Sequence, residues 1–342
     1  MRNIIIYTTF VILFAGCKKE IGPQNVSNSE IGNGNLLILN EGNFGTGNAS
    51  VSIYNPNSKE VFNNQFKAVN GFGIGDVLQS VNHNGDLYYF VVNNSGKVVV
   101  TDTNLVYQYE ITGFNSPRYI EFYGNKGFVT DLKQNAIYVV DLISKQITNQ
   151  ITTQGWTETI HIYKDKLLVL DRGNYLSNSD SNHIYFIDPI TESIVDSIKT
   201  NINPNSMVVE NNELWVLSSG KLGLNKASLS QYNLTNRHLI KNLEFNSFSD
   251  NPSRLVSDRN GRLFYINSSV YSFSVQDTML SQISFLRKTT ESFYGLYFSR
   301  ELNEIFITDA KDYTSLGEVK RLDLFGNQID VFEAGIIPQA LN

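Results

Sequence analysis

Leu36-Leu37-Ile38-Leu39-Asn40 is a short apolar run that ends in a polar residue, and similar runs recur along the chain. The further copies span residues 89–93, 127–131, 167–171, 214–218, 263–267 and 305–309. Their polar ends lie between 38 residues (93 to 131) and 53 residues (40 to 93) apart. Apolar runs of this length are typical of buried strands, and a repeat of about 40 to 50 residues is typical of propeller blades. The seven copies therefore predict an all-β fold, a seven-bladed β-propeller.

A second strand-like run follows each copy, and most of these runs end in Asn or Asp. They span residues 51–55, 98–102, 137–141, 184–188, 229–233, 270–273 and 319–323. Loops that contain proline precede several copies, at 116–118, 203–205 and 251–253, where the fixed φ of proline can start an inner strand. Each unit is therefore predicted to be a loop followed by four strands, which we name A to D. A β-sandwich or a β-helix is the alternative, because short, evenly spaced strands fit those folds as well.

The two ends of the predicted domain, residues 36–342, complement each other. Residues 335–341 resemble a strand A with no blade after it, whereas the first copy begins at Leu36 with no strand A before it. We therefore expect the C-terminal strand to complete blade one and to remove the open edges of the ring. No long segment with a 3.6-residue apolar period follows residue 20, which disfavours an α/β fold, and the glycine-rich stretch 71–75 is predicted to be a loop between blades.

Residues 1–17 have the pattern of a lipoprotein signal peptide. Met1 and Arg2 precede an apolar run over residues 4–14, and Ala15-Gly16-Cys17 then forms a lipobox. The apolar run is shorter than the roughly 20 residues that span a bilayer, so a retained transmembrane helix is the weaker alternative. Cys17 is the only cysteine, and we predict that acyl chains on it anchor the protein. Residues 18–35 are polar and rich in Asn, Ser and Gly, which predicts a flexible tether.

The composition argues against several classes of function. The net charge is −6 and the basic residues are scattered, so a nucleic-acid partner is not expected. The four histidines stand alone and the single cysteine leaves no cysteine-built site, so we expect no metal. Nucleophile-elbow, zinc-protease and phosphate-loop motifs are missing from the sequence, and we predict that the protein is not an enzyme. A carboxylate pair near the axis keeps a propeller hydrolase or lyase as an alternative.

A ligand of a propeller is expected over the central axis, on the face built by the loops that enter strand A and those that join strands B and C. From the B–C loops we predict ligand contacts by Glu41, Asn43, Phe44, Asn93, Asn94, Asp131, Arg172, Tyr175 and Tyr313. From the loops that enter strand A we predict contacts by Arg118, Trp156, Glu158, Asn205, Arg254 and Tyr294. Asp171, Asn174, Lys221, Lys311, Phe293 and Gln339 belong to the same loops. For Asp131 the alternative is a turn cap that accepts backbone hydrogen bonds.

The chain resembles a known family of propeller lipoproteins. The resemblance rests on the sevenfold repeat, the lipobox, Asn40-Glu41-Gly42-Asn43-Phe44-Gly45 and Ser52-Ile53-Tyr54-Asn55-Pro56. These features are similar to those of the DUF5074/YncE-like (YVTN-repeat) β-propeller lipoproteins of Bacteroidota. The best understood members are the BtuG-type surface lipoproteins, which bind cobalamin and pass it to a TonB-dependent outer-membrane transporter.

That resemblance implies an outer-membrane, lipid-anchored binding protein at the cell surface, or alternatively on the periplasmic face. Its ligand would be a corrinoid or another bulky nutrient, and it would carry no cofactor of its own, cobalamin being cargo. Amides and aromatic rings on the predicted face suit such a ligand, because rings cover apolar surfaces and amides pair with polar side groups. A protein-interaction scaffold at the cell envelope is the second hypothesis.

Overall fold

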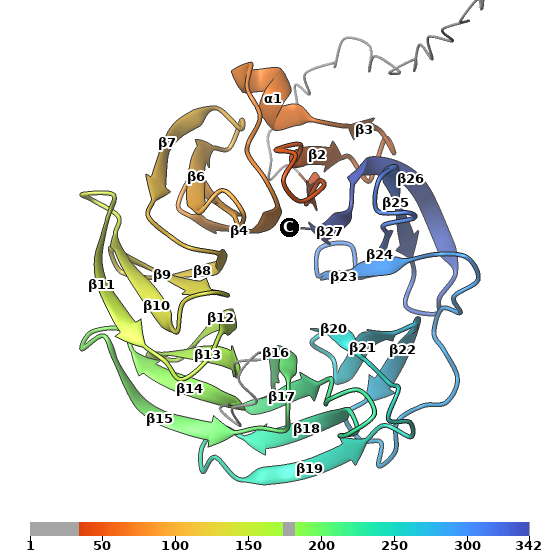
Figure 1. The fold of residues 1–342 in the computed structure, drawn as a ribbon. Coiled ribbons are helices and arrows are strands. Elements are labelled where there is room, and N and C mark those ends of the chain that lie inside the picture. The colour runs from red at the N-terminus through yellow and green to blue at the C-terminus, as the bar shows by residue number, and fades with distance from the viewer. Residues whose placement is uncertain (1–33, 174–181, 342) are drawn as a thin grey trace, which may run out of the picture.

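Seven antiparallel sheets surround a common axis in the computed structural model, which describes residues 34–173 and 182–341 (Figure 1). Blade one holds β27 (Pro338–Leu341), β1 (Leu36–Asn40), β2 (Ser50–Tyr54) and β3 (Val61–Phe62), in the order A to D. Blade two holds β4 (Leu78–Asn84), β5 (Leu87–Val92), β6 (Lys97–Asp102) and β7 (Tyr107–Thr112). Blade three holds β8 (Pro117–Tyr123), β9 (Lys126–Asp131), β10 (Ala136–Asp141) and β11 (Gln146–Thr152).

The remaining blades follow in chain order. Blade four holds β12 (Thr157–Tyr163), β13 (Lys166–Arg172), β14 (Asn182–Asp188) and β15 (Ser193–Lys199). Blade five holds β16 (Pro204–Glu210), β17 (Glu213–Ser218), β18 (Ser228–Asn233) and β19 (Leu239–Glu244). Blade six holds β20 (Ser253–Ser257), β21 (Arg262–Asn267) and β22 (Ser269–Ser274). Blade seven holds β23 (Phe293–Ser299), β24 (Glu304–Asp309), β25 (Leu316–Leu322) and β26 (Gln328–Ile336). The predicted seven-bladed propeller is confirmed.

The hydrophobic core is divided into seven clusters, each between two neighbouring blades. In β1, Leu37 and Leu39 pack toward blade two, whereas Leu36 and Ile38 pack toward blade seven. Successive side chains of a strand point to opposite faces, so a strand with a blade on each side must be apolar at every position. This is why the strand B runs are continuous instead of alternating.

The turns between strands C and D repeat one hydrogen-bonded arrangement, which explains the Asn or Asp at the end of strand C. In blade three the Asp141 carboxylate accepts hydrogen bonds from the backbone N–H groups of Ile143 (3.1 Å) and Ser144 (2.6 Å). Lys145 then adopts a left-handed conformation (φ 60°). Short acidic and amide side chains favour such turns because they bond to the backbone two and three residues ahead.

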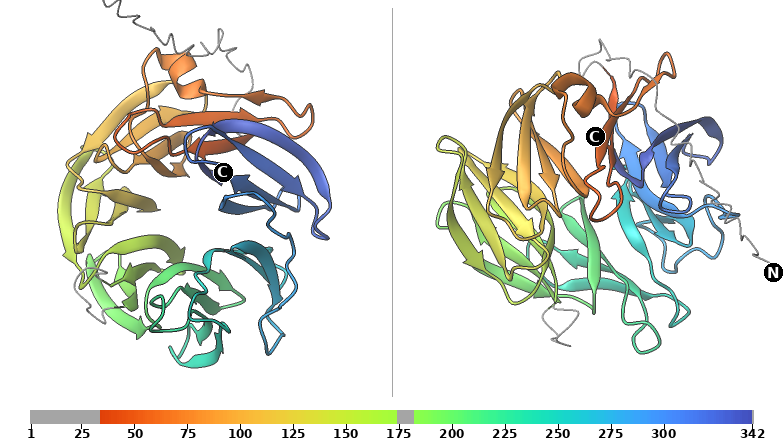
Figure 2. Two further views of the ribbon diagram at one scale, coloured as in Figure 1. Left: turned by 45° about the vertical axis from the view of Figure 1, so that its right-hand side comes forward. Right: turned by 45° about the horizontal axis from the view of Figure 1, so that its top comes forward.

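The C-terminal strand closes the ring as predicted. β27 pairs antiparallel with β1, with Ile38 opposite Leu341 and Leu39 opposite Ala340. The boundary differs from the prediction, because residues 335 and 336 belong to β26, the outer strand of blade seven. Gly335 fits there because a Cβ atom would collide with Asn40 of β1. In both views of Figure 2 the orange first blade and the blue seventh blade lie side by side.

Two connections depart from the regular pattern. Blade six has three strands within the described residues, and the outer position carries an irregular segment joined to β22 by one isolated bridge, Val270 to Leu286. Blades one and two are connected through α1 (Gln65–Asn70), the one helix of the described chain, and the glycine-rich stretch 71–75 continues this loop as predicted. Across the described residues, no helix has the length and apolarity needed to cross a bilayer.

The disc has two faces that the topology keeps distinct. We call the face formed by the D-to-A and B-to-C loops the belt face, and the face formed by the A–B and C–D turns the turn face. The described chain begins on the turn face: Leu36 pairs with Tyr54, where the C–D turn of blade one starts. A Cβ atom on Gly34 would lie 3.3 Å from Glu301, in the A–B turn of blade seven.

Candidate functional site

A ring of seven side chains occupies the belt-face end of the innermost strands. Each is the second residue of a strand A, and we call this set the belt: Gln79, Arg118, Glu158, Asn205, Arg254, Tyr294 and Gln339. In all seven blades the pairing of strands A and B shifts register at this residue. A bulge of this kind leaves a residue outside the ladder and re-aims its side chain. The repeated bulge explains how all seven blades present one residue each around the axis.

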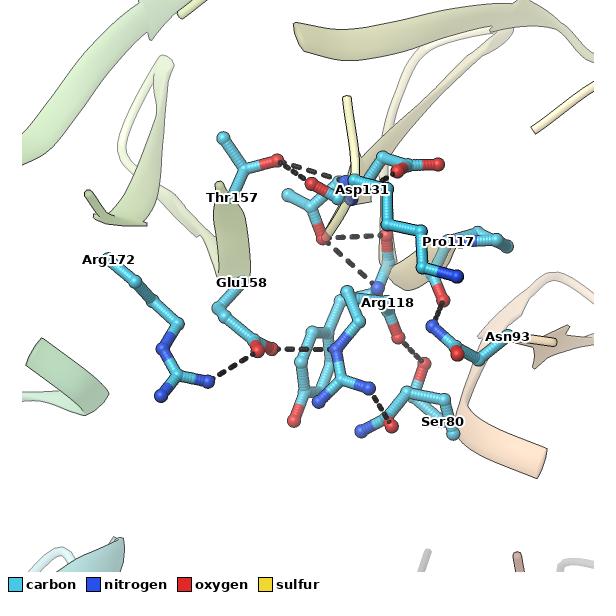
Figure 3. Close-up of polar contacts among 12 residues, drawn as sticks. Ser80, Asn93, Pro117, Arg118, Asp131, Thr157, Glu158 and Arg172 are labelled. Atoms are coloured by element: carbon cyan, nitrogen blue, oxygen red, sulfur yellow. Dashed lines mark hydrogen bonds and ion pairs between the residues drawn. The ribbon is translucent and has the colours of Figure 1, made fainter. Parts of the chain in front are cut away.

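Glu158 lies between two arginines (Figure 3). Arg118 donates from Nε to one carboxylate oxygen at 2.9 Å, and Arg172 donates from Nη1 to the other at 3.1 Å. The Glu158 side chain is 5% exposed. Burial alone would raise the pKa of Glu158, but the two guanidinium groups outweigh it and hold the pKa below its usual value. The group therefore stays charged and fixed.

The same network continues into blades two and one. Arg118 also donates to the Gln79 side-chain oxygen, and Gln339 donates to the backbone oxygens of Leu78 and Gln79. The Gln79 side-chain nitrogen is buried and has no hydrogen-bond partner among the described residues. An unpaired buried donor costs about 1–3 kcal/mol, so an acceptor on a bound ligand or water would stabilise this position.

On the other side of the axis, Glu41 and Tyr294 form a second polar pair. The Tyr294 hydroxyl donates to Glu41 at 3.0 Å, and Arg254 donates from Nε to the Tyr294 backbone oxygen at 3.0 Å. The Arg254 guanidinium also lies over the Tyr294 ring, 5.3 Å from its centroid. Burial raises the pKa of Glu41, although Arg254 and the Tyr294 hydroxyl oppose that shift.

Aromatic side chains rise from the loops around this pair. Tyr313 meets Tyr294 edge to face, with ring centroids 5.9 Å apart. Asn43 donates to the Tyr313 backbone oxygen, which ties the B–C loops of blades one and seven together. Phe44 is 74% exposed, and Trp156 is partly exposed. Exposed aromatic side chains above the polar belt suit a ligand that has both flat apolar faces and polar edges.

Three of the residues predicted to contact ligand make hydrogen bonds that hold the loops of the protein itself. Asp131 is fully buried, and its carboxylate accepts hydrogen bonds from four backbone N–H groups, those of Asn115, Ser116, Lys133 and Gln134. It is therefore a turn cap, the alternative that the sequence left open. Asn93 is buried and donates to the backbone oxygen of Pro117, and Asn94 donates to Asp76.

The remaining predicted residues fall into two groups. Asn205 is part of the belt and donates to the backbone oxygen of Pro252 at 2.7 Å. Tyr175 and Cys17 lie outside the described residues, as do Asn174 and the predicted tether up to residue 33. Gln79 is a belt residue that the sequence analysis missed: no proline marks the start of strand A in blade two, and Gln79 itself is neither charged nor aromatic, unlike Glu158 and Tyr294.

The bulged belt, the closed ring and the seven inter-blade cores define the class: an all-β propeller with a polar, aromatic-rimmed central face. The chain belongs to the family described as a domain of unknown function, DUF5074, whose model matches residues 33–332. No curated protein matches the sequence significantly.

Solved structures share the fold at low sequence identity. A quinonprotein alcohol dehydrogenase-like protein from Bacteroides thetaiotaomicron superimposes with a TM-score of 0.69 at 14% identity, covering 92% of this chain and 79% of that one. A putative 6-phosphogluconolactonase from Bacteroides fragilis gives 0.65 at 13% identity, covering 91% and 98%. BamB from Moraxella catarrhalis gives 0.52 at 16% identity, covering 76% of each chain. These similarities concern the fold alone.

Proposed function

We propose that this protein is a lipid-anchored binding protein of the bacterial cell envelope, whose belt face captures a bulky, amide-bearing nutrient of the corrinoid type. The observation that carries the proposal is the belt with its aromatic rim. The carboxylates of Glu158 and Glu41 are each paired with donors of the protein itself. A face whose charges are compensated in this way favours a ligand of low net charge that offers hydrogen-bonding groups and apolar area.

Binding is the better use of this face than catalysis. Glu158 is held charged between two arginines, and Glu41 accepts a hydrogen bond from the Tyr294 hydroxyl. A general acid–base pair needs one carboxyl free to gain or lose a proton next to the reacting group. Anchoring through Cys17 and delivery to a TonB-dependent outer-membrane transporter complete the proposal. They are supported by the lipobox and by the resemblance of residues 40–45 to the DUF5074/YncE-like propeller lipoproteins, whose best understood members are of the BtuG type.

The ligand is tested by calorimetric titration of cyanocobalamin into the purified protein. We expect binding at micromolar concentration or tighter. Phe44→Ala should weaken it about tenfold, which corresponds to about 1.4 kcal/mol. The matched control is Phe325→Ala, which removes an even more exposed ring on the turn face and should leave the affinity unchanged. The absence of any heat of binding at micromolar concentration would refute the proposal that the ligand is a corrinoid. Acylation of Cys17 is tested separately, by mass spectrometry of the N-terminal peptide.

A protein-docking role for the same face is the second candidate, and one observation favours it. Leu222 and Leu224 are exposed at the tip of the B–C loop of blade five, next to the exposed Phe248. The backbone N–H of Gly223 donates to the backbone oxygen of Phe248 at 3.0 Å, which joins the two loops that carry these side chains. If this patch docks a transporter, Leu222→Ser with Leu224→Ser should abolish co-purification with it and leave ligand affinity unchanged.

A further inference from the structure

We propose that the turn face of the propeller lies against a lipid surface, with Ile143, Ile190 and Phe325 partitioning into it. This inference rests on the membrane attachment in the proposed function and adds which face of the domain meets the lipid. It leaves the belt face pointing away from the membrane.

The three side chains occupy one equivalent position in the C–D turns of three blades. In six blades the backbone N–H of this position donates to the Asn or Asp that starts the turn, at 2.8–3.1 Å. The same bond fixes each turn, so the six side chains stand at the same level of the fold. Three blades carry a polar residue there, namely Asn57, Asn104 and Thr235. The other three carry Ile143, Ile190 and Phe325.

These apolar tips are among the most exposed large hydrophobic side chains of the described chain. Ile143 is 73% exposed, Ile190 is 71% exposed and Phe325 is 88% exposed. Scattered exposed apolar residues are ordinary, but these three occupy the same structural position on one face of the disc. Large apolar side chains at such a position enter the boundary between lipid headgroups and acyl chains.

The arrangement of the three blades lets the disc lie flat. Ile143 and Ile190 belong to the neighbouring blades three and four, and Phe325 belongs to blade seven. In a ring of seven, blade seven lies opposite the junction of blades three and four, as Figure 1 shows. Three points spread in this way support the whole face, whereas a cluster on one side would tilt the disc.

The start of the described chain identifies the occupant as lipid. The chain enters β1 on the turn face, and the 33 preceding residues contain the apolar run 4–14 and Cys17. An anchor built from either feature is joined to the domain on this face, so the turn face lies nearest to the attachment point. Each buried acyl chain on Cys17 contributes to membrane binding, and apolar side chains that enter the lipid add to it. The three apolar tips supply such an attachment on the side where the anchor enters.

The test uses the full acylated protein in phosphatidylcholine vesicles. Because acylation blocks Cys17, cysteine substitutions at single positions can carry an environment-sensitive nitrobenzoxadiazole label: Ile143→Cys, Ile190→Cys and Phe325→Cys. The control is Thr46→Cys in an exposed loop of the belt face. We expect label emission at the three turn positions to rise at least twofold on vesicles and to be quenched by doxyl-labelled lipids, with no change at position 46.

Each other outcome contradicts the inference in a distinguishable way. Protein that floats with vesicles while all three turn labels stay unchanged overturns the assignment of the face and leaves the anchor intact. Protein that does not float, and whose Cys17 reacts with thiol reagents, overturns the anchor and the inference together. Label emission that rises with protein concentration in the absence of vesicles would show that the turn face binds a second copy of the chain. That result would overturn the proposal that it lies against lipid.

Discussion

Glu158→Gln should destabilise the protein by about 2–3 kcal/mol at pH 7. The substitution keeps the shape of the side chain and removes the charge that Arg118 and Arg172 share. Removing one partner of a buried ion pair typically costs about 3–5 kcal/mol, because the remaining charge is left uncompensated. We expect a smaller loss of stability than this typical range for two reasons. The Arg172 side chain is 31% exposed and can regain water, and glutamine still offers Arg118 an oxygen that accepts its hydrogen bond.

Urea and thermal unfolding followed by circular dichroism measure this effect. A loss of 1 kcal/mol lowers the melting temperature of a somewhat smaller protein by about 2–4 °C. For Glu158→Gln we therefore expect the melting temperature to fall by about 5 °C. The matched control is Glu110→Gln, which removes the same charge from a more exposed pair with Lys97 at 2.8 Å and should cost less than about 1 kcal/mol. If both variants have the same melting temperature, Glu158 contributes no more to stability than an exposed salt bridge. That result would refute the inference that the two arginines stabilise the buried Glu158 carboxylate.

The dependence on pH gives a second check with a defined sign. The pKa of Glu158 is lower in the folded protein than its ordinary value of 4.5. A carboxyl with a depressed pKa contributes stability that is fully present above 4.5 and is lost as the pH falls through the folded value. The difference between wild type and Glu158→Gln should therefore be constant near neutral pH and shrink below pH 4.5. A difference that grows on acidification would contradict the assignment.

Three further predictions concern the closure, a cap and the last strand. Gly317→Ala places a Cβ atom against the ring of Pro338 in β27, so thermal unfolding should show a loss of stability of about 1–3 kcal/mol. The control Gly73→Ala, whose Cβ has no neighbour nearer than 3.7 Å, should leave the midpoint unchanged, and equal midpoints for the two variants would contradict the packing. Asp131→Asn should lower the stability measured in urea by about 1–3 kcal/mol, because the new side-chain NH2 group would face backbone N–H donors and could not accept their hydrogen bonds. Ligand affinity of the folded protein should stay unchanged, and weaker binding at full stability would instead indicate that Asp131 contacts the ligand. A chain that ends at Ile337 should melt at least about 10 °C lower and scatter light as its concentration rises, because β1 becomes an open edge; an unchanged melt would argue against closure.

Strands B and C could be located from the sequence because a buried strand between two blades must be apolar on both sides. The run 167–171 lies within β13, and the run 137–141 lies within β10. Closure by the last strand could be predicted as well, because blade one lacked an inner strand. The outer strands were harder to place, since solvent on one side leaves their sequence free. In blade six the outer position holds an irregular segment that no pattern in residues 275–292 indicates.

The belt could be predicted in part. Arg118, Glu158 and Asn205 each stand 13 residues before the polar end of their strand B run, at Asp131, Asp171 and Ser218. Applied to blade two, the same spacing before Asn93 points to Ser80, one residue after Gln79, so the repeat indicates the position of the belt to within one residue. Which arginine pairs with Glu158 depends on contacts between blades about 40 residues apart, and no local pattern encodes them.

The pairing of β27 with β1 also imposes an order on how the protein acquires its structure. Ile38 meets Leu341, its partner about 300 residues later in the chain, so the first blade to be synthesised is the last to be completed. Long-range contacts of this kind form late and slowly. During synthesis β1 lacks its inner neighbour until residues 338–341 have emerged, so the ring cannot close before then. For a chain that we propose to be exported, closure of the ring would therefore follow translocation of residues 338–341.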